Sequence, residues 1–138
     1  MLIAILTQQK YNDAAVKQFF RKAAEADKPV GVVFNQCDLE EDREYWPQWL
    51  ATFVGETGAQ PKLVYVIPYD RAASAQLRLP FYTVGCEGRL PPGEASSLRE
   101  ELARLHFDAI KIRTFRGAIG RVLDVERGAA GYLARLQA

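Results

Sequence analysis

The stretch Val30–Phe34, sequence VGVVF, and the stretch Asn35–Asp38 that follows it, sequence NQCD, decide the fold. A short apolar run that is rich in β-branched residues and then turns polar predicts a buried strand. The next helical pattern begins several residues later, so Asn35–Asp38 is expected to form a loop at the carboxyl end of this strand. In an open parallel sheet, ligands bind at that end of the strands. The sequence therefore predicts a strand with a candidate site directly after it.

Strand-like and helix-like patterns alternate on both sides of this stretch. Leu2–Leu6 and Leu63–Ile67 are two further apolar runs of strand length. Between the three runs lie two amphipathic segments, Asn12–Ala26 and Tyr45–Val54, whose apolar residues recur at helical spacing. The order strand, helix, strand, helix, strand requires right-handed crossovers and a parallel sheet. We expect one truncated α/β domain over residues 1–138 in three layers, with a parallel sheet of at least three strands and helices on both faces.

Three local signals refine this outline. Asn12 or Asp13 can cap the first helix. The second helix tolerates Pro47 only in its first turn and is expected to stop at Gly55. After the third strand, Phe81–Val84 is either a short extra strand or an extended loop. Two more helical patterns follow, and the second of them starts near Asp108.

Composition excludes several classes of protein. With 49% hydrophobic and 25% charged residues among 138, the chain is globular and not disordered. A net charge of +1 gives no reason to expect DNA, RNA or an acidic membrane as a partner. Two cysteines, Cys37 and Cys86, are too few for a disulfide scaffold and favour a reducing compartment. Because the sequence has neither a signal peptide pattern nor an apolar run of about 20 residues, we expect a cytoplasmic domain with no membrane span.

Asn35–Asp38 resembles the N-K-x-D element with which P-loop GTPases read guanine, with Gln36 at the position of the lysine. The order of elements in roughly the first 75 residues also resembles the second half of Ras-like and Era-like G domains. The resemblance implies that Asp38 accepts hydrogen bonds from N1 and N2 of guanine and that Asn35 braces the loop. It also implies that the side chain of Gln36 covers one face of the base, although only in part.

The same resemblance gives a role to Ser74 and Ala75. They would stand in for the S-A pair of those GTPases, whose backbone N–H faces O6 of guanine. The pair lies further beyond its strand than is usual in the family. A helix cap at Ser74, for a helix over Ala75–Leu79, is the structural alternative.

The elements that hold phosphate in P-loop GTPases are missing from this sequence. It contains no G-x-x-x-x-G-K-[ST], and none of its ten glycines has an Asp three positions before it. The resemblance therefore implies a GTPase-derived domain that cannot hydrolyse GTP alone. A guanine nucleotide is the one ligand that it suggests. No catalytic residue, metal ligand set, Mg²⁺ site or other cofactor site is recognisable.

Three functions stay open at this point. The chain is a GTPase-derived nucleotide-binding module, a non-enzymatic interaction or assembly domain on a half-Rossmann scaffold, or an unrelated small α/β enzyme with its site at the same strand ends. In the second case Asp38 only orients the turn Leu39–Asp42, because Asn and Asp are favoured in turns and caps.

The strand expected at Leu2–Leu6 has a consequence for assembly. In a complete G domain the equivalent strand lies inside the sheet, next to the strand that leads into the phosphate loop. Without that neighbour, Leu2–Leu6 is an apolar edge with no Lys, Pro or charge to prevent pairing. We expect a symmetric homodimer that joins two Leu2–Leu6 strands antiparallel, or a separate chain that supplies the missing half.

Overall fold

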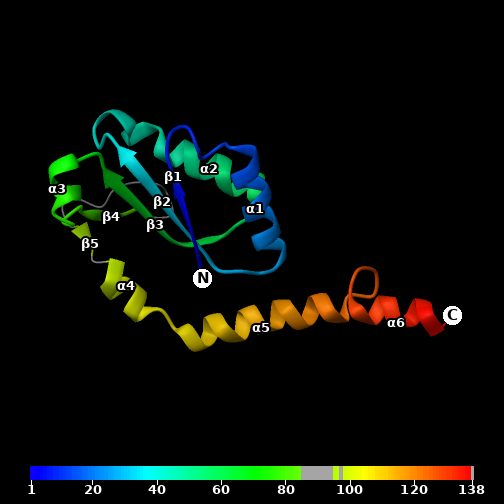
Figure 1. The fold of residues 1–138 in the computed structure, drawn as a ribbon. Helices are drawn as coiled ribbons and strands as arrows, with labels where there is room; N and C mark the ends of the chain where they lie inside the picture. The colour runs from blue at the N-terminus through cyan, green and yellow to red at the C-terminus, as the bar shows by residue number, and fades with distance from the viewer. Residues whose placement is uncertain (85–94, 97, 138) are drawn as a thin grey trace.

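The computed structural model describes residues 1–84, 95–96 and 98–137. Its described strands form one sheet in the order β1-β2-β3-β4-β5 (Figure 1). The first three strands are parallel, and the last two continue the sheet antiparallel. Their bounds are β1 (Leu2–Leu6), β2 (Val30–Cys37), β3 (Pro61–Pro68), β4 (Phe81–Thr83) and β5 (Ala95–Ser96). The predicted α/β class with three parallel strands is confirmed, and Phe81–Thr83 is a strand and not a loop.

Helices follow the predicted order. Their bounds are α1 (Ala14–Glu25), the 3-10 helix η1 (Glu41–Glu44), α2 (Trp46–Thr57), α3 (Arg71–Ala75), α4 (Leu98–Arg104), α5 (Phe107–Leu123) and α6 (Ala129–Gln137). Asp13 caps α1, since its carboxylate accepts hydrogen bonds from the backbone N–H groups of Ala15 and Val16 at 3.0 and 3.2 Å.

The predicted end of the second helix was wrong. Gly55 lies inside α2, and the helix ends at Gly58, whose φ of +70° is a left-handed C-cap that glycine adopts at little cost. The extra turn is held by the hydroxyl of Thr57, which donates to the carbonyl of Phe53 at 2.6 Å. Thr57 is itself buried, so packing extends the helix beyond the first glycine.

Both long crossover helices pack on the same face of the sheet. Phe20 of α1 and Phe53 of α2 meet edge to face at 5.4 Å between ring centroids. The buried cluster on this face contains Ala4, Leu6, Phe20, Ala23, Val32, Phe34, Trp46, Trp49, Phe53 and Val66. Each fully buried large side chain of this kind stabilises the fold by about 1.5–3 kcal/mol. This cluster fixes the register of β1, β2 and β3, and with it the relative heights of their carboxyl ends.

The opposite face of the sheet has a smaller core. Val33, Tyr65 and Ile67 are buried there, packed against Leu63, Leu79, Phe81 and Leu98. On β1, which pairs with β2 alone among the described strands, Ile3 and Ile5 are 41% and 67% exposed. A full helix layer on this face, and therefore the three-layer arrangement, stays a prediction.

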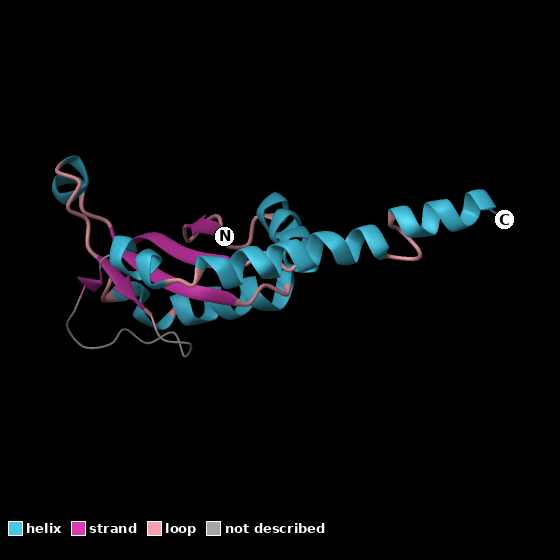
Figure 2. Cartoon of the chain, turned by 90° about the horizontal axis from the view of Figure 1, so that it is seen from below, coloured by secondary structure: helices cyan, strands magenta, loops and turns pink. Residues whose placement is uncertain are grey.

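The C-terminal helices leave the sheet as an arm. In Figures 1 and 2, α5 and α6 run past the sheet and end far from it. The arm is attached near the turn that follows α1, where the guanidinium of Arg113 donates to the carboxylate of Asp27 at 2.6 Å. Gly117 lies so close to this turn that a Cβ there would be 2.6 Å from the carbonyl oxygen of Ala26. No helix in the described part of the chain is long and apolar enough to cross a membrane.

Candidate functional site at the carboxyl ends of the strands

The end of β2 differs from the predicted loop. Asn35, Gln36 and Cys37 continue the strand, with Phe34 opposite Val66 and Cys37 opposite Pro68. Between these two pairs β2 contains one residue more than β3, and this extra residue forms a β-bulge. Gln36 adopts a left-handed φ of +61°, which is costly for a residue with a side chain. Bulges of this kind are common beside functional sites, because they redirect neighbouring side chains.

A polar pocket opens beside the bulge. It has a volume of about 280 Å³ and is lined by Asn35, Gln36, Pro68, Tyr69, Asp70, Arg71, Ser74 and Leu79. Three of the predicted nucleotide-binding residues, Asn35, Gln36 and Ser74, thus meet at one pocket. Asp38 and Ala75 are not among the residues that line it. Amide, hydroxyl and charged groups converge here, so the pocket can hold a small polar ligand.

Asp38 is used locally. One oxygen of its exposed carboxylate, Oδ1, accepts the backbone N–H groups of Glu40 and Glu41, both at 2.9 Å. The hydrogen bond from Glu41 and then that from Glu40 hold the pKa of the Asp38 carboxyl below its ordinary value. These contacts are the ones expected of a residue that orients the turn Leu39–Asp42. Guanine recognition by Asp38 stays a prediction.

Asp42 is an important site-supporting residue that the sequence did not single out. It is only 5% exposed, and each of its carboxylate oxygens has a partner. Oδ1 accepts from the side-chain amide of Gln8 at 2.7 Å, and Oδ2 accepts from the backbone N–H of Asp38 at 2.8 Å. Asp42 therefore ties the segment after β1 to the end of β2. Its place in the acidic run Glu40–Glu44 is typical of solvated residues, so no sequence signal marked it.

Cys37 is a packed side chain and not a nucleophile. It is buried, and burial raises the pKa of its thiol to about 12, with the negative charge of Asp42 as a further cause. A thiol with this pKa stays protonated at neutral pH, whereas a reactive cysteine needs its thiolate. Cys86 lies outside the described residues.

The alternative role predicted for Ser74 was wrong. Asp70 caps α3, since its carboxylate accepts the backbone N–H of Ala73 at 2.9 Å. Ser74 and Ala75 lie inside this short helix, and the expected helix over Ala75–Leu79 does not form. Leu77 has a left-handed φ of +56°, which is incompatible with continuing the helix.

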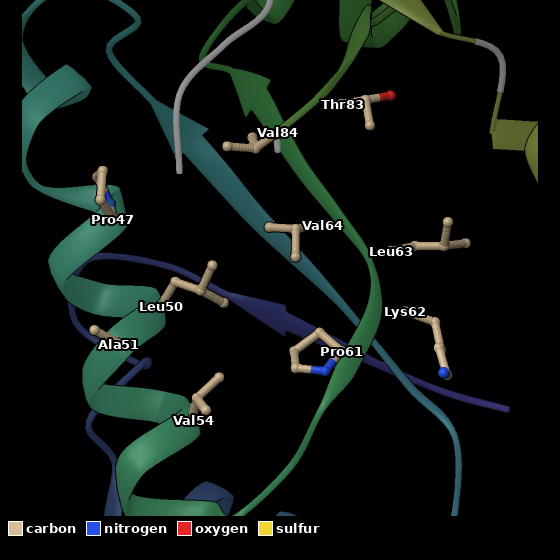
Figure 3. A pocket seen from close by; sticks show the side chains of 10 residues that line it. All are labelled: Pro47, Leu50, Ala51, Val54, Pro61, Lys62, Leu63, Val64, Thr83 and Val84. Atoms are coloured by element: carbon tan, nitrogen blue, oxygen red, sulfur yellow. The ribbon is translucent and has the colours of Figure 1, made fainter. Parts of the chain in front are cut away.

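A larger apolar pocket lies elsewhere. Figure 3 shows Leu50 and Val54 of α2 facing Val64 of β3 across it. It has a volume of about 470 Å³, and Lys62 is the one charged residue among those that line it. The pocket reaches Pro61, at the amino end of β3, where the sequence predicted no site. It can hold an apolar group but offers few polar groups to orient a substrate.

Among the described residues, no group of three or more His, Cys, Asp and Glu side chains could hold a metal ion. Comparison of the chain with protein-family models, with curated proteins and with solved structures found no match. The resemblance to GTPases therefore rests on Asn35–Asp38 and on the order of the first elements.

Proposed function

We propose that this chain is a non-enzymatic assembly domain that pairs with a second copy of itself along β1. The observation that carries the proposal is the position of β1 at the edge of the sheet, with Ile3 and Ile5 exposed. An apolar edge strand without Lys, Pro or charge is a template for another strand.

The opposite face of the sheet supports the same proposal. Val33, Tyr65 and Ile67 are covered there, but Ile3 and Ile5 at the β1 edge are not. Antiparallel pairing of two β1 strands would place Ile3 and Ile5 of both copies together on that face of one continuous sheet. A two-fold arrangement of this kind closes on itself and leaves no further edge at β1.

The oligomeric state of Ile5→Lys tests the proposal. Because Ile5 is 67% exposed, a lysine there leaves the core unchanged but places a charge at the edge of the sheet. The matched control is Leu77→Lys, which adds the same charge at a 94% exposed apolar residue outside β1. Light scattering should find a dimer for the wild-type chain and for Leu77→Lys, and a monomer for Ile5→Lys. A wild-type chain that stays monomeric at micromolar concentrations would overturn the homodimer.

We propose, as a second candidate, a GTPase-derived origin with weak purine binding at the polar pocket. The observation that favours it is the meeting of Asn35, Gln36 and Ser74 beside the β2 bulge. A base held there would have amide and hydroxyl partners. Hydrolysis by this chain alone is not part of the proposal, since the phosphate loop is missing from the sequence.

Calorimetric titration with guanosine, GDP, GTP and ATP tests this candidate. We expect guanine compounds to bind more tightly than ATP, Asn35→Ala to weaken the binding of all four compounds, and Asp38→Asn to abolish the guanine preference. Gln48→Ala is the control, because Gln48 is an exposed amide on α2 outside the pocket. Equal or undetectable binding of all four compounds at millimolar concentration would contradict it.

A further inference from the structure

Helix α5 presents its apolar stripe to solvent and not to its own domain. Ile112, Phe115, Ile119, Val122 and Leu123 recur at the spacing of one helical face, and all five are exposed. The residues of α5 that contact the turn after α1 are a charged and a small one, while Phe107 and Ile110 line a pocket with Met1. Arg113 pairs with Asp27, and Gly117 lies against Ala26. The helix is thus amphipathic with its apolar side outward, opposite to a helix that packs on its own core.

Positive charges border this stripe. On a helical projection of 100° per residue, Lys111 falls on one side of the stripe and Arg116 on the other. Asp108 is the single acidic residue in α5, against four Lys and Arg. The whole segment 107–137 holds six Lys and Arg and three Asp and Glu, so the net charge of +1 for the chain conceals a basic arm. An apolar stripe with basic borders is typical of helices that lie in the interface of an anionic membrane.

We propose that α5 lies flat on an anionic lipid surface, with Phe115 and Ile119 inserted below the headgroups. Lys111 and Arg116 then reach the lipid phosphates from the two sides of the helix, as basic residues at a membrane interface do. The occupant is a phospholipid surface and not a membrane-spanning environment, because the apolar residues cover only one side of the helix.

The geometry favours a flat surface over a second copy of α5. Two such stripes packed together would bring the Lys111 and Arg116 cations of both copies to the borders of one interface with no acidic residue of the stripe to pair with, which opposes pairing. Arg113 and Gly117, which contact the domain at Asp27 and Ala26, lie on the side of α5 away from the stripe. Helix α6 continues beyond α5 in Figure 2, and its Tyr132, Leu133 and Leu136 are also exposed.

Co-sedimentation of the full chain with vesicles tests the proposal. The probes are phosphatidylcholine vesicles and vesicles in which about 30% of the lipid is phosphatidylglycerol. We expect binding to the anionic vesicles alone, weakened by added salt. Two double variants should each lower the partition coefficient at least about tenfold. The first combines Phe115→Asp with Ile119→Asp, and the second combines Lys111→Glu with Arg116→Glu.

Matched controls separate this site from the rest of the surface. Leu77→Asp removes an exposed apolar residue outside the arm, and Arg43→Glu with Arg78→Glu reverses two exposed charges elsewhere. Both controls should bind anionic vesicles like the wild type, with unchanged circular dichroism. Ile5→Lys should also bind, so loss of the β1 dimer and loss of lipid binding are distinguishable.

Two results would overturn the proposal. One is equal sedimentation with and without anionic lipid. The other is a dimer that becomes monomeric in the Phe115 and Ile119 variant, since the stripe would then be a protein interface.

Discussion

Replacing Asp42 by Ala removes the buried carboxylate that joins the segment after β1 to the end of β2. The backbone N–H of Asp38 loses a charge-assisted partner at 2.8 Å, and the amide of Gln8 loses one at 2.7 Å. A hydrogen bond to a charged group contributes about 1.5–3 kcal/mol, and Gln8 can partly recover by turning to water. We therefore expect the free energy of unfolding to fall by about 2–4 kcal/mol, and Tm by roughly 6–16 °C for a domain of this size.

Urea unfolding followed by tryptophan fluorescence measures this change, because buried Trp46 and Trp49 report on the core beside η1. Glu41→Ala is the matched control, since it removes the same charge from the same short helix at an exposed residue and should cost under about 0.5 kcal/mol. Asp42→Asn should stay within about 1 kcal/mol of the wild type, because Gln8 can reverse its amide and accept from the new NH₂ group. Equal stability of Asp42→Ala and Glu41→Ala would show that the carboxylate does not hold this junction.

Three further substitutions have defined outcomes. Gln36→Gly should raise the free energy of unfolding by about 0.5–1 kcal/mol in urea titrations, because glycine tolerates the φ of +61°. For Cys37 the folded pKa is raised from 9.0 to about 12, so its stabilisation is complete below pH 9.0 and is lost as the pH rises toward 12, by about 1.4 kcal/mol per pH unit. Cys37→Ala should lack this component, and identical slopes for the two proteins between these pH values would contradict the assignment. Gly117→Ala should loosen α5 and speed its proteolysis, because the new Cβ would lie 2.6 Å from the carbonyl oxygen of Ala26. Gly120→Ala meets no atom within 4 Å and should instead protect the helix; faster cleavage of both variants would refute the proposed contact.

The strands and helices of the first half were predictable because their signals are local. Each strand of the parallel core is an apolar run, and Asp13 and Pro47 mark helix starts by their own chemistry. The end of α2 was not predictable in the same way, because the choice between Gly55 and Gly58 depends on burial of Thr57. The local sequence pattern predicts that a helix forms here, while tertiary packing determines where its last turn ends.

The site was less predictable for a related reason. The sequence motif predicted that Asn35, Asp38 and Ser74 line one site. Asn35 and Ser74 do line the same pocket, but the motif gave no sign that Asp38 lies outside it. The role of Asp42 depends on Gln8, which is distant in the chain and reaches it only after β1 and β2 pair. The outward stripe of α5 was hidden similarly, because periodicity identifies an apolar side without saying which way it faces.

The order of strands in the sheet has a consequence for how the chain folds. β1, β2, β3, β4 and β5 stand side by side in the order of the sequence, so each described strand pairs with the one made just before it. No strand has to wait for a later segment to be inserted between it and its neighbour, as a central strand does in many α/β domains. Each strand pairing therefore closes only the loop to the preceding strand, so the entropy of loop closure is lost in small steps, which favours rapid folding. The sheet can grow in one direction while the chain is still being synthesised, with β1 protected by pairing with β2 on one side only.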